Sequence, residues 1–396
     1  MMMVALLAQC PMVPAGTIVM FDGPPPPGWQ ILTDFHDRFP RGTTTYGGAT
    51  GGTTSHTHII SGTTSSGTTI PNCGSDYFSN TIYAMDPHTH NYYTITDPAD
   101  HIPPYRTFIF AKALYNFGYL PQNAVVMSYY PPTRPEWTDI TSTMMDRFPR
   151  GHNTTPGLTG GTTSHSHTYS GTTTTNTSGS GDVYYPGSTY DTPYSEMHNH
   201  TFSGTTSSAD HIPPYRTVRF WKATSTPAYI DSCRVIYMYD TLPPCPYITV
   251  DSDFNGRFPR ANTTTGVNGG SSTHSHYYSF TTSTYCASFV WTSGAVTWHL
   301  PRCHEHTASG WTSSADHTPP YRTVIFALHC GPLSYDEGVE VSEKVPLDAD
   351  REYVVYNVYG KEVLRGKGNI LELSKLPKGV YLVVSEGKIR RYIKRR

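Results

Sequence analysis

The sequence predicts an all-β protein built from three internal repeats and a separate C-terminal module. Glycine, proline and tyrosine are abundant, with 34, 33 and 30 copies among 396 residues. β-Branched and aromatic residues suit the pleated surface of a sheet, whereas glycine and proline end strands and form turns. No segment shows the apolar period of an amphipathic helix. We therefore expect short strands throughout.

A histidine motif defines the repeat. The motif Gly-Gly-Thr-Thr-Ser-His-Thr-His and its two close copies follow one another at intervals of 109 residues, at 51–58, 160–167 and 269–276. A second His-x-His pair follows each copy, at 88–90, 198–200 and 304–306. Six such pairs in register are not a chance pattern, so the function of the chain depends on what these imidazoles hold.

The other motifs keep the same order in every copy. Arg-Phe-Pro-Arg precedes the two histidine pairs, and Asp-His-x-Pro-Pro-Tyr-Arg-Thr precedes a final apolar strand. The motifs place the repeats at 14–119, 120–229 and 230–332. Three equivalent units can close around a pseudo-threefold axis or stack as a linear array, and we favour the closed body. The segments between the paired histidines vary most and are expected to form exposed loops.

The histidine pairs predict metal sites. Residues i and i+2 of a strand point to the same face, so both imidazoles of His-x-His can bind one ion. Three such strands around an axis would form a closed site with six nitrogen ligands, which argues against calcium and magnesium and suits iron, zinc, nickel or cobalt. We expect two sites, and thus about two ions per chain. The predicted ligands are His56, His58, His165, His167, His274 and His276 in one site, and His88, His90, His198, His200, His304 and His306 in the other.

Two alternatives to these sites stay open. The two pairs of one repeat could form a four-histidine site, giving three ions per chain, or the histidines could only pack and hydrogen-bond. A third matched set, His101, His211 and His317, is expected to support the ligands from outside. The recurring arginines are expected to form ion pairs with the aspartates before that set. Histidines without counterparts, such as His329, are expected at the surface.

The cysteines indicate disulfides. Seven cysteines without a Cys-x-x-Cys motif, in a threonine-rich chain that we expect to be extracellular, imply some disulfides and at least one leftover thiol or intermolecular bond. The expected local pairs are Cys233–Cys245 and Cys286–Cys303, and Cys10 and Cys330 flank the repeats and could join them.

Several function classes are not expected. The net charge of −2 gives no reason to propose a nucleic-acid partner. No stretch approaches the roughly 20 apolar residues of a membrane-spanning helix. The chain contains no defensible catalytic set, and a closed six-imidazole site leaves no coordination position for a substrate. An enzyme is therefore not expected, and a metalloenzyme is a remote alternative.

The two ends differ from the repeats. Residues 1–13 form an apolar segment, either the remnant of a secretion signal or a strand that pairs with a neighbouring subunit. Lysine and arginine are concentrated near the C-terminus, which marks 333–396 as a separate module. Closely spaced strand patterns and tight turns in this module predict a small β-sandwich.

The ordered motifs resemble those of phage tail-collar and short-tail-fibre proteins over about 14–330. The shared pattern is Gly28-Trp29, Arg-Phe-x-Arg-Gly, Gly-Gly-x-x-x-His-x-His and Pro-Pro-Tyr. In that family three chains intertwine, and His-x-His pairs can hold a metal on the axis. The resemblance implies that one chain with three repeats does here what three subunits do there. The copies depart at Glu136-Trp137, at Pro246-Tyr247 and at Ala261.

The C-terminal module resembles the sorting domain of type IX secretion cargo, at 356–363 and 376–381. That resemblance implies export to the cell surface or beyond. The chain is therefore expected to be a secreted, metal-stabilised structural protein, most concretely a self-associating subunit of an extracellular filament or surface appendage. The second candidate is a monomeric tail-fibre-like adhesin that binds surface glycans through its tyrosine- and threonine-rich loops.

Overall fold

The chain divides into two compact units, Met1–Gly331 and Pro332–Arg396. The computed structural model describes residues 11–69, 88–175, 198–231, 233–243, 245, 248–293, 296–329, 339–340, 344–357, 362–372, 379–385 and 388–394. The described residues form β-strands and two short 3-10 helices, and no α-helix occurs among them. The predicted all-β class is confirmed.

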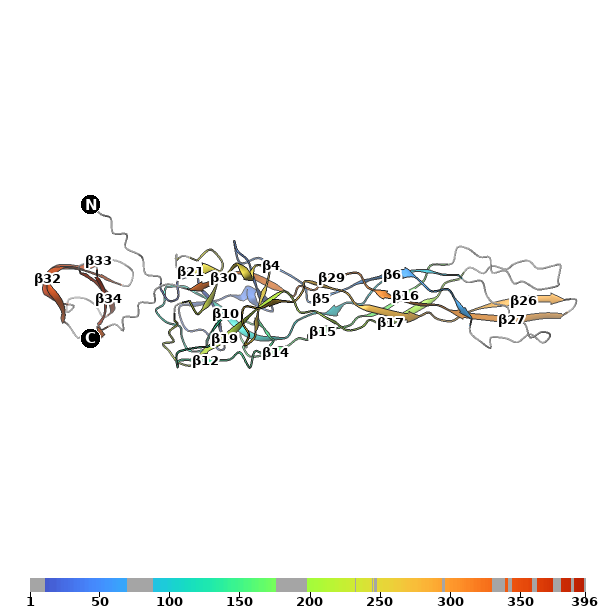
Figure 1. Cartoon of the computed structure of the whole chain (residues 1–396), viewed down its shortest axis with the longest axis horizontal. Coiled ribbons are helices and arrows are strands. Elements are labelled where there is room, and N and C mark those ends of the chain that lie inside the picture. Colours follow the sequence, from blue (N-terminus) through green and yellow to red (C-terminus); the bar gives the residue numbers. More distant parts are fainter. Residues whose placement is uncertain are drawn as a thin grey trace. The chain divides into compact units, whose positions relative to one another are not determined.

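Most strands of the three repeats in the first unit recur in the same order. Figure 1 labels many of them. The first repeat contains β1 (Ile18–Phe21), β2 (Trp29–Ile31), η1 (Thr33–Phe35), β3 (Phe39–Gly42), β4 (Thr50–Gly51), β5 (Ser55–His56), β6 (Ile59–Thr63), β7 (Thr68–Thr69), β8 (Asn91–Ile95), β9 (Ala99–Asp100) and β10 (Tyr105–Ala113). The second contains β11 (Ala124–Ser128), β12 (Trp137–Asp139), β13 (Phe148–Gly151), β14 (Thr159–Gly160), β15 (Ser164–His165), β16 (Thr168–Thr172), β17 (Thr201–Thr205), β18 (Ala209–Asp210) and β19 (Tyr215–Ala223). The third contains β20 (Ile236–Tyr239), β21 (Ile248–Val250), η2 (Ser252–Phe254), β22 (Phe258–Ala261), β23 (Asn268–Gly269), β24 (Thr273–His274), β25 (Tyr277–Thr281), β26 (Tyr285–Ser293), β27 (Val296–Glu305), β28 (Thr307–Trp311), β29 (Ala315–Asp316) and β30 (Tyr321–His329).

The repeats close into a ring. The Arg-Phe-Pro-Arg strand of each repeat lies parallel to the last strand of another repeat: β13 pairs with β10, β22 with β19 and β3 with β30. The last of these pairings joins the first repeat to the third. The opening strands also pair with one another, β1 with β11, β11 with β20 and β20 with β1. A linear array would leave the outer repeats without these partners, so the predicted pseudo-threefold body is confirmed.

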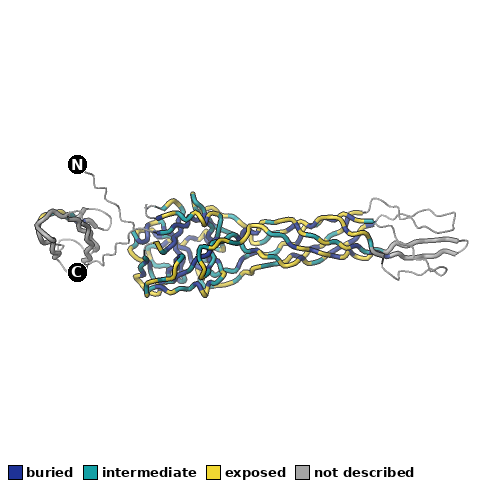
Figure 2. Tube along the Cα trace, viewed as in Figure 1, coloured by how far each residue is buried: buried dark blue, intermediate teal, exposed yellow. Residues whose placement is uncertain are grey.

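Apolar side chains from all three repeats fill this ring. One core cluster combines residues such as Met20, Met127 and Met238 from the three opening strands. A second cluster brings together Phe39, Phe148 and Phe258, the phenylalanines of the three Arg-Phe-Pro-Arg motifs. Phe39 meets the other two edge-on, at centroid distances of 6.5 and 6.4 Å. Buried residues are dense in this part of the unit and extend into the narrower part that carries the histidines (Figure 2).

Beyond the phenylalanines, each repeat extends as an antiparallel arm. The arms are β5–β9 with β6–β8, β15–β18 with β16–β17, and β24–β29 with β25–β28. Backbone hydrogen bonds link each arm to the next, for example from the Asp97 amide to the Thr168 carbonyl (2.9 Å). A ring of aromatic and aliphatic side chains lies inside the three arms, formed by Ile60, Tyr92, Tyr169, Phe202, Tyr278 and Phe280. Each histidine pair therefore lies at a fixed level of a three-armed bundle.

The described strands of the second unit form one five-stranded sheet in the order β31-β35-β34-β32-β33. They are β31 (Val339–Glu340), β32 (Lys344–Asn357), β33 (Glu362–Glu372), β34 (Gly379–Ser385) and β35 (Lys388–Lys394). The β-sandwich expected for this module stays a prediction. The two longest strands of the sheet, β32 and β33, stay paired across register shifts at Pro346/Arg351 and Val355/Tyr356. Such irregularities bend a strand, so the sheet can curl.

The departure at Ala261 has a steric cause. At the equivalent Gly42 and Gly151, an added Cβ would lie 1.9 Å from the Phe254 carbonyl oxygen and 2.0 Å from that of Phe35. Both phenylalanines end a 3-10 helix. The second repeat has a turn at 141–146 instead, with Met144 in the buried position. This different backbone accommodates the methyl group of Ala261.

We predict that Gly151→Ala lowers the free energy of unfolding by about 3 kcal/mol, because the new methyl group cannot be placed without moving the 3-10 helix. The matched control Ala261→Gly should cost about 1 kcal/mol, the loss of a single buried methyl group. Urea unfolding followed by tryptophan fluorescence measures both. Equal stability of Gly151→Ala and the unmodified protein would contradict the packing described above.

Candidate metal centres

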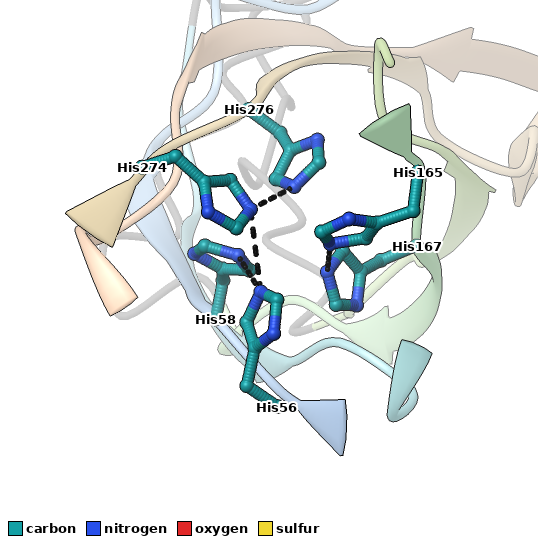
Figure 3. A group of neighbouring side chains, drawn as sticks. All are labelled: His56, His58, His165, His167, His274 and His276. Atoms are coloured by element: carbon teal, nitrogen blue, oxygen red, sulfur yellow. Dashed lines mark hydrogen bonds between the residues drawn. The ribbon is translucent and has the colours of Figure 1, made fainter. Parts of the chain in front are cut away.

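The histidine pairs of the three arms converge at two levels. The proximal cage consists of His56, His58, His165, His167, His274 and His276, and the distal cage of His88, His90, His198, His200, His304 and His306. In each cage the six possible ligand nitrogens lie within 4.8 Å of one another. Figure 3 shows the six proximal rings pointing toward one another from the three arms. The alternative of four-histidine sites within single repeats does not fit this arrangement.

The spacing of the nitrogens fits octahedral coordination. In the proximal cage Nε2 atoms face one another at 3.0 Å (His56–His58), 2.9 Å (His165–His167), 2.9 Å (His274–His276) and 3.3 Å (His56–His274). In the distal cage the Nε2 distances from His198 are 3.2 Å to His88 and 3.0 Å to His304. An ion bound by six nitrogens at about 2.1 Å would hold neighbouring nitrogens about 3.0 Å apart and opposite ones about 4.2 Å apart. Both cages therefore have the dimensions of a six-nitrogen site.

The second histidine of every pair presents a lone pair to its cage. The Nδ1 of His58 lies 2.7 Å from the Ser313 carbonyl, and that of His90 lies 2.8 Å from the Thr174 carbonyl. A carbonyl only accepts, so Nδ1 carries the proton and Nε2 of the neutral ring has the free lone pair. The other four contacts have the same form: His167–Asp97, His200–Ser283, His276–Ser207 and His306–Ser65. Every one of these bonds joins two different repeats.

In the distal cage two of these lone pairs have no hydrogen-bond partner. The Nε2 atoms of His90 and His306 are buried and unpaired. Leaving a buried polar atom unpaired is unfavourable, and a cation at the centre would satisfy both nitrogens at once. The donor set, all imidazole nitrogen, suits first-row transition metals rather than calcium or magnesium. The residues present thus fit a metal ion.

Burial keeps the imidazoles neutral. Desolvation by burial, followed by the proximity of other histidines, lowers the pKa of His56 and His274 to about 2 and of His304 to about 3. Desolvation likewise lowers the pKa of His90 to about 4, against the opposing effect of its hydrogen bond to the Thr174 carbonyl. Neutral imidazole is the form that binds metals, so the cages are prepared for coordination at neutral pH.

The third matched set of histidines lies directly outside the proximal cage. The Nδ1 of His101 lies 2.7 Å from the Nδ1 of His56. His211 and His317 contact His165 and His274 in the same way, at 2.8 and 2.6 Å. All three rings of this set are fully buried. They are therefore placed to hold three of the proximal ligands in orientation.

Sequence reasoning missed the threonines that position the cages. A buried threonine follows the second histidine of every pair by six residues: Thr64, Thr96, Thr173, Thr206, Thr282 and Thr312. Each hydroxyl accepts the backbone N–H of the second histidine on the facing strand, for example Thr96 from His58 (2.9 Å) and Thr64 from His90 (3.0 Å). The constant spacing is visible in the sequence and could have identified them.

Two expectations from the sequence were wrong. Asp100, Asp210 and Asp316 are exposed, and within the described residues most of the recurring arginines pair with other acids, as Arg106 does with Asp22. Arg150 pairs with Asp37 and also stacks on Tyr105 of the Pro-Pro-Tyr motif in the preceding repeat, with its Cζ 4.7 Å from the ring centroid. His329 is fully buried, and its Nε2 bonds to the Pro11 carbonyl, because β30 passes through the core.

The disulfides are only partly described. Cys233, Cys245 and Cys303 are each disulfide-bonded. Cys286 faces Cys303 in the register of β26 and β27. Cys10 and Cys330 lie outside the described residues. The pairing pattern remains a prediction.

Comparisons with family models, curated proteins and solved structures find no match for this chain. Within the described residues, no helix is long and apolar enough to cross a membrane. The functional argument therefore depends on the two cages.

We predict that the metal-free protein loses stability as pH falls from about 6.5 to about 4. The folded state keeps the pKa of the cage histidines well below 6.5. Their contribution to the free energy of unfolding is therefore fully present above pH 6.5. It disappears on acidification, because the unfolded chain takes up protons that the folded chain cannot. Urea midpoints across this range measure the effect. A variant of the two partly exposed histidines, His36→Asn with His152→Asn, should keep the same slope, and a flat profile would contradict the prediction.

We predict that Thr312→Val lowers the free energy of unfolding by about 1–3 kcal/mol, because the buried N–H of His276 loses its acceptor. Valine preserves the shape and the strand preference of threonine. Thr89→Val, at an exposed position inside a His-x-His pair, should change stability little. Thermal unfolding of both variants in the same buffer separates the loss of the hydrogen bond from the general effect of replacing threonine by valine. Equal effects would contradict the assigned role of Thr312.

Proposed function

We propose that this chain is a secreted, metal-stapled structural protein, most concretely a subunit of an extracellular filament or surface appendage. The observation that carries the proposal is the convergence of twelve histidines from three repeats on two closed cages. An ion in either cage would join segments far apart in the sequence. Because it binds the folded chain and not the unfolded one, it would raise the free energy of unfolding, by an amount that grows with the logarithm of its affinity.

The metal in each cage is proposed to be iron, zinc, nickel or cobalt. Six nitrogen donors around one centre suit Fe(II), Co(II) and Ni(II), whereas zinc usually prefers four ligands. When bound, the ion supplies cross-linking rather than chemistry, since six imidazoles fill its coordination positions. Catalysis at a metal needs an open position for water or substrate. We therefore propose a structural role and no enzymatic activity.

Self-association is supported by exposed apolar side chains on the first unit. Leu114, Tyr115 and Tyr119 follow the last strand of the first repeat and are 49%, 64% and 42% exposed. Contiguous apolar surface is a common feature of protein contacts. The C-terminal module, by its resemblance to sorting domains, supports placement at the cell surface or beyond.

A monomeric adhesin is the second candidate, and one observation favours it. The variable segment of each repeat lies between its two histidine pairs and ends at the distal pair. Because the distal histidines converge, the three segments end around one centre. Several copies of a weak site gathered in this way would bind a surface glycan by avidity.

We predict that the purified full chain elutes as assemblies much larger than 43.9 kDa and appears as filaments by electron microscopy. The paired substitution Leu114→Glu with Tyr115→Glu should shift it to a monomer without altering its metal content, because the charges oppose apolar contact. An unmodified chain that stays monomeric at high concentration and binds glycans on an array would favour the adhesin function. Light scattering after size exclusion gives the mass.

A further inference from the structure

The second arginine of the Arg-Phe-Pro-Arg motif has the same contacts at all three repeat boundaries. Arg41, Arg150 and Arg260 each stack on a tyrosine of the neighbouring repeat, with Cζ 4.7 Å from the ring centroid. Each Nε also donates to a backbone carbonyl of that repeat, at 3.2 or 3.3 Å. These two contacts fix the direction of the remaining N–H groups, so each guanidinium is held ready for an acceptor.

Two of the three boundaries supply that acceptor from within the chain. It is an aspartate carboxylate 3.2 Å from Nη2, from Asp37 at Arg150 and from Asp146 at Arg260. The third boundary has Gly256 in this place, and within the described residues Arg41 takes part in no ion pair. The backbone is left-handed at all three positions, with φ of 58°, 59° and 72°. The glycine therefore replaces the aspartate without a change of backbone conformation.

The place of the missing carboxylate is open. Apart from its chain neighbours, a Cβ added at Gly256 would have one atom within 4 Å, the Nη2 of Arg41 at 3.8 Å. The aspartates at the other two boundaries have side chains that are 57% and 52% exposed, so this position faces solvent. A carboxylate from outside the chain can thus reach a guanidinium that is already oriented to receive it.

An exposed tyrosine lies over the same boundary. Tyr46, five residues after the arginine, is 75% exposed, and its counterparts in the other repeats are Thr155 and Thr265. The next residue, Gly47, donates its N–H to the Asp240 carbonyl at 2.8 Å, so this loop of the first repeat reaches the third. Tyrosine and arginine are enriched at protein interfaces, which makes this boundary suited to contact with another protein surface.

We propose that Arg41 binds a carboxylate from an acidic side chain of a second copy of this chain. The inference rests on the proposed function, because it gives self-association one of its contacts. Acids are available for it: Asp100 and Asp210 are exposed and take part in no ion pair in the part of the chain that the structure describes. The pseudo-threefold body has this open position at a single boundary. A contact between two unlike faces repeats from copy to copy and builds an open polymer.

The test compares two substitutions at Gly256 that have the same shape and differ in charge. Gly256→Asp supplies the carboxylate from within the chain and displaces that of the neighbour. It should raise the concentration of half-maximal assembly by about tenfold. Gly256→Asn should change this concentration little, because a neutral amide does not replace the carboxylate, and asparagine also tolerates left-handed backbone. Light scattering of the full chain over a dilution series measures both variants.

Substitution of the arginine gives a second, independent comparison. Arg41→Gln should weaken assembly as Gly256→Asp does, whereas Arg150→Gln should not, because Arg150 is already paired within the chain. Modification by phenylglyoxal, mapped by mass spectrometry, reports the state of each guanidinium. In the dissociated chain Arg41 should react faster than Arg150, and in the assembled chain Arg41 should be protected.

The outcomes separate this inference from the proposed function. Equal assembly of Gly256→Asp and Gly256→Asn would overturn the contact at Arg41 while leaving the filament proposal intact. Unprotected Arg41 in the assembled chain would do the same. An unmodified chain that stays monomeric would overturn both proposals. Retention of that monomer on a polyuronate matrix, lost in Arg41→Gln, would assign the position to an acidic glycan instead.

Discussion

Six imidazole lone pairs facing one centre are the constraint on which the architecture depends. Each second histidine has its Nδ1 proton committed to a carbonyl of another repeat, so its Nε2 must face inward without a proton. Burial opposes protonation, and the nitrogens crowd to about 3 Å. A shared cation would relieve this arrangement at both levels. The hydrogen bonds that orient these histidines also join the repeats. The same contacts therefore set the geometry of the cages and close the ring of repeats.

Much of this arrangement could be predicted from the sequence, because the motifs recur at regular intervals. Strand periodicity puts both imidazoles of a His-x-His pair on one face, and triplication implies a common centre. The threonine six residues after each pair is equally periodic. Threonine is so frequent in this chain, however, that this recurrence does not stand out from the other threonines. The arginine partners could not be predicted. Asp37 comes close to Arg150 only after one repeat crosses another, and Asp22 comes close to Arg106 only when β1 pairs with β10. The burial of His329 likewise depends on the depth of β30 in the core.

A single chain with three repeats can have different residues at equivalent positions, which three identical subunits cannot. Here two contacting residues change together at one repeat boundary. Lys112 reaches Asp240 at 3.4 Å, and Lys222 reaches Asp22 at 2.7 Å, each across a repeat boundary. At the third boundary the lysine is replaced by Leu328 and the aspartate by Tyr129, and both pack against the main core. Ala261, which replaces a glycine, faces the turn at 141–146, where the other two repeats have a 3-10 helix. These paired changes fix which repeat lies beside which.

The metal content of the native protein tests the central claim most directly. The protein should be purified without chelator or affinity-tag nickel, and the metal per chain counted by elemental mass spectrometry. Two closed six-imidazole cages predict close to two ions per chain. A value near three would instead indicate separate sites within the repeats. Folded protein with no bound metal would contradict the account and leave the histidines as packing residues.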